Sequence, residues 1–319
     1  MKVLRFPLFI LLTITFWACE NAEPEQSAVA TEKQHVQGLL LTQNFPYDNT
    51  DQNKMSGPYQ QNERLSVPAD LAPQNKWVMF EGPVLENDLI AYRFYLDRRH
   101  RNDIYGKRVK DLVMDTVSWN YHDIMDWGSD ILKVGTSLGI GSPAIWYQDS
   151  IYALENWESK TIEQLKLGDK SAGFRMIFNG LDIAGQKISL QQDWTLNAGE
   201  AWSTIELEVL NGQLPDGMFF VTGIVKHLDN CISKAFQTHR YAYTWGQQSF
   251  HEEQMGMGIL LPNTYQPEAI EDKESHAFVF KNAPQKVAYQ FVAAWERDVI
   301  GIKDAPGFEK LLIEAITGK

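Results

Sequence analysis

The sequence predicts a mainly β protein built from stacked antiparallel sheets, with few helices. After residue 186 the chain consists of short apolar or alternating runs, separated by breaks such as Asn211-Gly212 and Pro215-Asp216-Gly217. This pattern is typical of strands joined by turns, and strands at this spacing pair into antiparallel sheets that bury one face. The predicted strands are 187–196, 203–210, 218–226, 239–245, 257–261, 277–281 and 287–295.

The N-terminus has the features of an export signal. A basic start precedes the apolar run 6–16, which is too short to span a bilayer comfortably. Ala18-Cys19 fits a lipoprotein cleavage box, but Phe16 and Trp17 differ from the usual leucine and small residue, so lipidation and ordinary secretion both stay open. We expect a signal peptide at 1–19 with Cys19 lipidated, a disordered polar tether at 20–37 and a single folded domain at 38–319. The protein would then be an outer-membrane-anchored lipoprotein, periplasmic or at the cell surface, with no other membrane contact.

Composition restricts the possible partners. The net charge is 29 − 41 = −12, which argues against nucleic acid because a phosphate backbone needs a basic surface. Ten Trp, twelve Tyr and sixteen Phe build cores and also stack on sugar rings, so they permit carbohydrate binding. No phosphate-binding loop or dinucleotide fingerprint occurs, and we expect no cofactor.

If Cys19 is lipidated, Cys231 has no disulfide partner and is expected to be a buried structural thiol.

The segment 88–98 is predicted to be a strand with two different faces. Alternation places four apolar side chains on one face, predicted to be the core. On the other face, Arg93, Tyr95 and Asp97 are candidates for chemistry. A pairing of Arg93 with Asp97 on a solvated sheet would explain the same pattern, and the alternation does not decide between the two.

The segment 121–141 combines a histidine with acidic residues and glycines. His122, Asp126 and Asp130 are four apart, so a helix would place them on one face, where they would bind a metal or orient the imidazole. The glycines of this segment instead favour a loop whose backbone approaches another group closely. We favour a hydrogen-bonded loop without a metal, in which the two aspartates orient His122 or cap a turn.

The sequence predicts a helix at the C-terminus. Phe308, Leu311, Leu312, Ala315 and Ile316 follow the period of one amphipathic helix.

Several motifs in the first half of the chain resemble one family. They are Glu81-Gly82-Pro83, Ala91-Tyr92-Arg93-Phe94-Tyr95-Leu96-Asp97, Asp103-Ile104-Tyr105-Gly106-Lys107, and Asp126-Trp127-Gly128 running through Asp130-Ile131-Leu132-Lys133-Val134-Gly135 to Ser137-Leu138-Gly139-Ile140-Gly141. They resemble a bacterial domain-of-unknown-function family of secreted proteins from polysaccharide-degradation gene clusters, over most of the chain after Asp70. A member of that family is an ulvan oligosaccharide dehydratase, which removes water from a non-reducing-end uronic acid to leave a 4,5-unsaturated sugar.

The resemblance implies this hydro-lyase activity, with a uronic-acid-containing oligosaccharide as substrate. With the strand count and the few helices, it favours a β-supersandwich for the catalytic domain 38–319. This is the large two-sheet fold shared by galactose mutarotases and several uronate lyases.

Dehydration of a uronic acid requires a cation for the carboxylate, a base for the C5 proton and an acid for the leaving C4 hydroxyl. Arg93 is the candidate for the cation, because a guanidinium forks onto a carboxylate. We therefore expect Arg93→Ala and His122→Ala to abolish dehydration with little effect on folding. The other candidates are His122 or Tyr95 as the base, His227 or Tyr243 as the acid, and Lys133 as a group that holds the carboxylate or biases the tyrosine.

Substrate contacts are predicted at Trp127, Arg240, Tyr243 and His251. In the strand 239–245, Tyr243 shares a side with other aromatic residues, so that side is either a sugar platform or a core face.

Other functions fit the same residues. A polysaccharide lyase would use the same base and cation but would cleave a glycosidic bond, so the size of the product distinguishes it from a dehydratase. A non-catalytic glycan-binding lipoprotein would suit the aromatic content and the anchor. A mutarotase-like activity would be supported by fold analogy alone.

Overall fold

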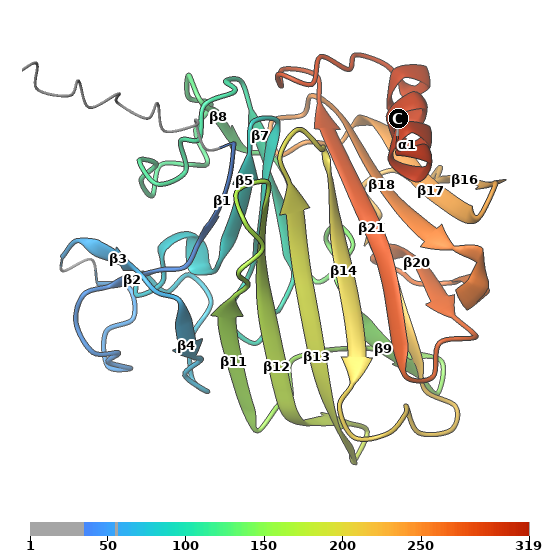
Figure 1. Cartoon of the computed structure of the whole chain (residues 1–319), viewed down its shortest axis with the longest axis horizontal. Coiled ribbons are helices and arrows are strands. Elements are labelled where there is room, and N and C mark those ends of the chain that lie inside the picture. The colour runs from blue at the N-terminus through green and yellow to red at the C-terminus, as the bar shows by residue number, and fades with distance from the viewer. Residues whose placement is uncertain (1–34, 55–56, 319) are drawn as a thin grey trace, which may run out of the picture. The chain divides into compact units, whose positions relative to one another are not determined.

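The largest element of the fold is an antiparallel sheet that spans the front of the view in Figure 1. The computed structural model describes residues 35–54 and 57–318. We call this antiparallel sheet the large sheet. Its strand order is β16-β17-β18-β21-β14-β13-β12-β11-β4. Burial alternates residue by residue along its central strands, so one face is apolar. The strands are β4 (Arg64–Ser66), β11 (Ser159–Gln164), β12 (Ser171–Ile183), β13 (Gln186–Asn197), β14 (Trp202–Val209), β16 (Ile232–Phe236), β17 (His239–Gln247), β18 (Gln254–Pro262) and β21 (Lys286–Trp295).

Two smaller sheets form the opposing layer. The first small sheet has the order β1-β5-β6-β7-β8 and the second has the order β10-β9-β15-β20-β19. The segment 139–141 joins them, because the Ile140 N–H donates to the Asn102 carbonyl of the first sheet at 3.4 Å and the Gly141 N–H donates to the Gly223 carbonyl of the second at 2.8 Å. One continuous apolar core contains side chains from all three sheets.

The strands of the first small sheet are β1 (Val36–Leu39), β5 (Val84–Asn87), β6 (Ile90–Phe94), β7 (Asn102–Lys107) and β8 (Gly128–Asp130). Those of the second are β9 (Ala144–Tyr147), β10 (Ser150–Ala153), β15 (Phe219–Val225), β19 (Pro267–Ile270) and β20 (Ser275–Phe280). A separate pair, β2 (Leu41–Gln43) and β3 (Tyr59–Gln61), and the short 3-10 helices η1 (Met79–Glu81) and η2 (Asn263–Tyr265) complete the elements.

The helix α1 (Ala305–Thr317) covers the face of the large sheet opposite the core. The Asp304 side chain caps it by accepting the Gly307 N–H. Phe308 and Leu312 pack from the helix onto Tyr243 and its neighbours in β17 and β18. The aromatic side of the strand 239–245 is therefore a packing face, and no sugar platform forms there.

The structure confirms the predicted fold class, a large antiparallel β-sandwich with few helices. Each strand predicted after residue 186 matches an observed one, and the C-terminal helix is present. Because Val36 pairs with Asn87, the first strand begins inside the predicted tether. The described residues belong to one unit, Gln34–Lys319. The predicted signal peptide with Cys19, and residues 20–34, lie outside the described residues. In the described ranges, no helix has the length and apolarity needed to cross a membrane.

A fully buried lysine lies within the core. The Nζ atom of Lys160 donates to the Leu96 carbonyl at 3.0 Å and lies 3.1 Å from Nδ1 of His100. The His100 ring stacks on Phe94, and its Nε2 lies 2.7 Å from Oε1 of Gln192. Burial lowers the pKa of Lys160 to about 7, so the structure disfavours the charge of this amine.

We predict that Lys160 makes stability depend on pH above neutrality. The pKa is about 7 in the folded state and 10.5 for an ordinary lysine, so between these values the unfolded chain binds more protons. The free energy of unfolding then rises with pH by up to about 1.4 kcal/mol per pH unit. Urea unfolding between about pH 7.5 and 9.5 should show a steeper rise for the native protein than for Lys160→Met.

The control for this measurement is Lys187→Met, because the Lys187 side chain is 59 % exposed. It should leave the slope unchanged. Parallel curves for the native protein and Lys160→Met would contradict the prediction.

Candidate active site

Strand register brings charged and phenolic side chains together on the first small sheet. Arg93 of β6 pairs with Asp103 of β7, and Tyr105 of β7 pairs with Asp130 of β8. Directly opposite residues of an antiparallel pair point to the same face, and these four lie on the face turned away from the main core. Ile90, Tyr92 and Phe94 of β6 face that core, whereas Ala91 packs on the side of Arg93, so the two predicted faces of this strand are confirmed.

Arg93 is the centre of this group and has no exposed surface. Its Nε and Nη2 donate to Oδ2 of Asp103 at 3.1 and 2.7 Å, and Nη2 lies 3.0 Å from Oδ2 of Asp130. Its Nη1 donates to the Phe80 carbonyl at 2.9 Å and to the Tyr121 hydroxyl at 3.1 Å. All five N–H groups of the guanidinium have acceptors within the protein.

This saturation gives Arg93 a positioning role in place of the predicted contact with a substrate carboxylate. A buried guanidinium without a free N–H group cannot fork onto a ligand. The alternative pairing with Asp97 is also absent. Asp97 instead binds Arg99, whose Nη2 lies 2.5 Å from Oδ2 of Asp97 and 2.6 Å from Oε2 of Glu81.

His122 is the solvent-facing end of the cluster. Its Nδ1 lies 3.3 Å from Oδ2 of Asp130, and its side chain is 51 % exposed. Partial burial and the Arg93 cation lower the pKa of His122, so the imidazole is neutral at pH 7. Its Nε2 has no hydrogen-bond partner among the described residues. A neutral imidazole, oriented through one nitrogen and free at the other, suits a general base.

Asp130 is held beside a second carboxylate. Burial and the neighbouring charge of Asp103 raise the pKa of Asp130 well above its usual range, although the Arg93 cation opposes this rise. One guanidinium thus serves two carboxylates. The predicted orienting contact of Asp130 with His122 is present.

Tyr95 lies between two guanidinium groups. The central carbon of Arg93 lies 4.3 Å from its ring centre, and that of Arg99 lies 3.7 Å from it. The Tyr95 hydroxyl accepts from Arg93 and donates to Asp103 at 3.0 Å. Burial raises the pKa of Tyr95, and this effect exceeds the opposing effect of Arg93. Its predicted role as the base required a lowered pKa, so the structure leaves His122 as the base candidate.

The turn beneath the cluster has a strained backbone. Phe80 and Glu81 are non-glycine residues with φ of 60° and 59°, a left-handed conformation that costs about 1–3 kcal/mol per residue. The contact of the Phe80 carbonyl with Arg93 holds this turn in place. At the next position, Gly82, a Cβ atom would lie 1.8 Å from the carbonyl oxygen of Phe94. The Glu81-Gly82 motif therefore supports the cluster from below.

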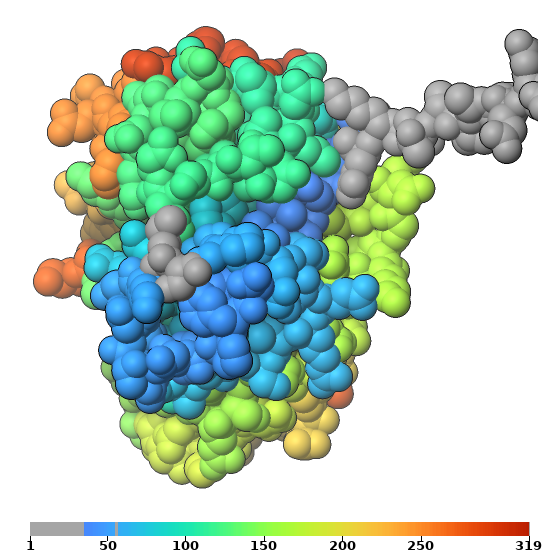
Figure 2. Space-filling model, turned by 90° about the vertical axis from the view of Figure 1, so that its left-hand side faces the viewer, coloured from blue at the N-terminus to red at the C-terminus, as the bar shows by residue number. Residues whose placement is uncertain are grey.

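His122 lies in the loop 108–127, as predicted, and the helical alternative is wrong. Asp126 is exposed in this loop and apart from Asp130, which belongs to β8. Figure 2 shows the loop in green, above the blue segment that contains β2 and β3, and a bond from Trp119 Nε1 to the Tyr59 hydroxyl at 3.0 Å joins them. Among the described residues, no group of three or more His, Cys, Asp and Glu side chains is placed to hold a metal.

A buried ion pair fastens the start of this loop. Nζ of Lys107 lies 2.7 Å from Oε1 of Glu86, and neither side chain has exposed surface. The Glu86 carboxylate also accepts the N–H groups of residues 113 and 114, at 2.8 and 3.0 Å. The loop that carries His122 is thus tied to the first small sheet.

A second loop, 248–253, reaches His122 from the large sheet. The ring of Phe250 lies 5.8 Å from the His122 ring, at an angle of 31°. Nζ of Lys133 lies 5.1 Å from the centre of the Phe250 ring, and Nε2 of His251 lies 2.8 Å from Oγ of Ser129. Sequence reasoning missed Phe250, because the loop has no periodic pattern and its neighbours come from another sheet.

Two more predicted residues lie close to this cluster. His227 is exposed, and its Nε2 lies 2.8 Å from the carbonyl oxygen of Lys133, so it supports the segment that carries this lysine. Trp127 is half-buried and packs against Tyr105, with ring centres 6.3 Å apart. Neither residue contacts the free nitrogen of His122.

The remaining predicted residues lie on the large sheet. Tyr243 is buried beneath α1, and its hydroxyl donates to Glu309 at 3.2 Å. Arg240 donates to Oγ of Ser233 at 3.1 Å. The structure does not bring these two into the cluster.

Cys231 is half-buried, and burial raises its pKa to about 11, so it is a protonated thiol.

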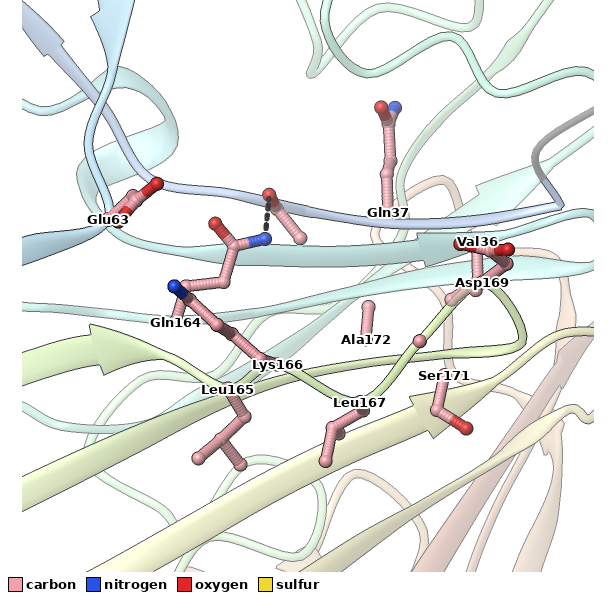
Figure 3. Close-up of a pocket in the computed structure, with 12 residues that line it drawn as sticks. Val36, Gln37, Glu63, Gln164, Leu165, Lys166, Leu167, Asp169, Ser171 and Ala172 are labelled. Carbon is pink, nitrogen blue, oxygen red and sulfur yellow. Dashed lines mark hydrogen bonds between the residues drawn. The ribbon is translucent and has the colours of Figure 1, made fainter.

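A pocket lies away from the cluster, between β1 and the segment 165–172 (Figure 3). Its volume is about 280 Å³. Gln37, Glu63, Lys166 and Asp169 contribute its polar lining, and no histidine or aromatic residue is among the described residues that line it. Because this pocket offers neither an imidazole nor an aromatic stacking surface, we place the candidate site at His122.

Fold and site define an antiparallel β-sandwich protein with a buried arginine–carboxylate cluster beneath an exposed histidine. The chain belongs to the family described as "Domain of unknown function (DUF4861)", whose family model matches residues 12–317. The expected family-level resemblance to a domain of unknown function is thereby confirmed. No curated protein matches the sequence.

Two solved structures show distant similarity. One is the α-N-acetylgalactosaminidase NagBb from Bifidobacterium bifidum in complex with GalNAc, with a TM-score of 0.36, 11 % identity, and coverage of 74 % of this chain and 38 % of that chain. A quadruple mutant of NagBb has a TM-score of 0.33, 10 % identity, and coverage of 66 % and 36 %. This chain therefore spans less than two thirds of their length, and a similarity this distant carries no functional argument.

We predict that Arg93→Lys destabilises the fold by about 3–5 kcal/mol, because it leaves two buried carboxylates without their paired donors. The matched control is Arg175→Lys. Arg175 pairs with Asp193 at 2.6 Å, but the two side chains are 33 % and 20 % exposed. This change should cost less than about 1 kcal/mol.

Urea unfolding of both variants measures the difference. An equally small loss in both would show that Arg93 is not the buried support that its contacts indicate. The result also tests the sequence-based expectation that replacing Arg93 leaves folding intact.

Proposed function

We propose that this protein is a carbon–oxygen lyase that eliminates water from the non-reducing-end uronic acid of an ulvan-type oligosaccharide. The product would be a 4,5-unsaturated uronate. The observation that carries the proposal is the exposed, neutral imidazole of His122, which is oriented by Asp130. Its ring lies beside the Phe250 ring, which Nζ of Lys133 also approaches. The resemblance to a family with a dehydratase member supports the choice of reaction.

In the proposed reaction, Nε2 of His122 takes the C5 proton. The electrons of the C5–H bond form the C4–C5 double bond, the C4–O bond breaks, and the hydroxyl leaves as water after it gains a proton. Lys133 stabilises the negative charge that builds on the carboxylate as the proton leaves. His251, the second imidazole beside the Phe250 ring, supplies the proton to the leaving hydroxyl.

The buried residues act on this chemistry through His122. Arg93 fixes Asp130, and Asp130 fixes the orientation of the imidazole. Their contribution is to keep the base in one geometry and in its neutral form. They are positioning residues, because none of them has exposed surface from which to touch a substrate.

A polysaccharide lyase is the second candidate, because the same base and cation serve when the leaving group is a sugar. Dehydration leaves the chain length unchanged, whereas a lyase shortens the chain. We also propose, from the sequence around Cys19, that the protein is anchored to the outer membrane by a lipid.

The test is to incubate the purified protein with ulvan-type oligosaccharides that end in glucuronic or iduronic acid. Ultraviolet absorbance reports the unsaturated uronate, and mass spectrometry reports the size of the product. We expect the loss of one water with an unchanged chain length. Unsaturation with shortened chains would establish the lyase instead, and no product would contradict both activities.

We predict that His122→Gln lowers kcat/KM by about a hundredfold to ten-thousandfold without changing the free energy of unfolding. In the native enzyme, kcat/KM should rise with pH through the pKa of His122, which lies below the ordinary value of 6.5, because only the neutral ring accepts a proton. His239→Gln is the control, since this half-buried histidine contacts Thr238 at the far end of β17.

The control should keep both the rate and the acidic limb of the pH profile. A His122→Gln variant with normal turnover, or with the same acidic limb, would remove His122 from the role of base.

A further inference from the structure

We propose that Phe250 and Lys133 form the subsite that holds the uronic acid, with the apolar face of the sugar ring on Phe250 and the carboxylate at Nζ of Lys133. This inference rests on the proposed function for its substrate class. It goes further by assigning the residue that positions the ring against His122. Phe250 is a binding and positioning residue and takes no part in proton transfer.

The first observation is the exposure of Phe250. It is 36 % exposed and is the only aromatic side chain among the exposed large hydrophobic residues of the described chain. An aromatic face in contact with water is an available surface for the C–H face of a sugar. A single exposed hydrophobic residue needs no functional explanation, but Phe250 lies beside the candidate base, His122.

The second observation is that the protein holds this ring in place. The N–H of Phe250 donates to the Ile131 carbonyl at 2.7 Å, and the next residue, His251, contacts Ser129. At the end of the loop, Glu253 accepts from Nε1 of Trp295 at 2.7 Å. A platform fixed before binding loses little conformational entropy when the ligand arrives.

The third observation is the arrangement of the cation and the base around this ring. Nζ of Lys133 and the ring of His122 lie 5.1 and 5.8 Å from the centre of the Phe250 ring. Lys133 forms no ion pair with any described residue. In a uronic acid, the carbon that loses the proton is bonded directly to the carboxylate. A base and a free cation beside one stacking surface match this pair of groups.

A second pair of the same kind allows a matched control. Nζ of Lys281 lies 4.6 Å from the ring centre of Phe219 and 4.9 Å from that of Trp146, in the second small sheet. No histidine ring packs against these rings within the described chain. Loss of Phe219 therefore tests whether any cation–aromatic pair on the surface contributes to sugar binding.

The experiment measures binding without turnover. Isothermal titration of His122→Gln with a trisaccharide ending in glucuronic acid gives the reference affinity. Adding Phe250→Ala should weaken binding about tenfold or more, Phe250→Trp should keep it within about threefold, and Phe219→Ala should leave it unchanged. Lys133→Gln should weaken binding of the acid but not of the same trisaccharide with its carboxyl group reduced to an alcohol.

The outcomes separate this proposal from the proposed function. If Phe250→Ala and Lys133→Gln bind normally while the native enzyme forms unsaturated product, the subsite is wrong and the function stands. If binding depends on both residues but the native enzyme forms no unsaturated product, the subsite stands and the function is wrong. No binding together with no unsaturated product from the native enzyme would overturn both. Thermal unfolding of each variant shows whether it is folded, and the tryptophan variant tests the platform independently of the alanine one.

Discussion

The rest of the site depends on the burial of one guanidinium. A charge without exposed surface is costly unless every one of its donors is paired, and Arg93 meets this condition with two carboxylates, two phenols and a main-chain carbonyl. These acceptors come from β7, β8, the loop 108–127, the turn before β5 and Tyr95, which follows β6. The requirement to pair Arg93 therefore fixes the register of the first small sheet, and it holds the strained turn at Phe80 beneath the cluster.

Charge at this site is arranged by depth. The buried level contains one cation and two carboxylates, so the carboxyl group of Asp130 has a raised pKa and the arginine is permanently charged. Above them, His122 is held neutral by partial burial and by the same cation. His122, Lys133 and Phe250 are exposed at this point. The chemistry thus belongs to the exposed layer, whereas the buried layer sets its geometry.

The sequence pointed to part of this site for sound physical reasons. Alternation in β6 depends on backbone geometry alone, so it placed Arg93 and Tyr95 on the correct face. It did not show that Asp103 is the partner of Arg93, because that pairing follows from the register between two strands. Tyr95 could act as a base only if a nearby cation lowered its pKa, but burial raises this pKa, and burial is a property of the whole fold. Phe250 was missed because its loop comes from the large sheet.

The sequence by itself determined the mainly β class, the strands after residue 186, the C-terminal helix and the loop around His122. Each of these follows from local periodicity or from glycine and turn residues, which act within a few positions along the chain. Only the tertiary structure decided that α1 covers the aromatic side of β17, that Arg93 has no free N–H group and that Phe250 lies against His122. These are contacts between segments distant in sequence, and a local pattern does not specify which buried surfaces meet.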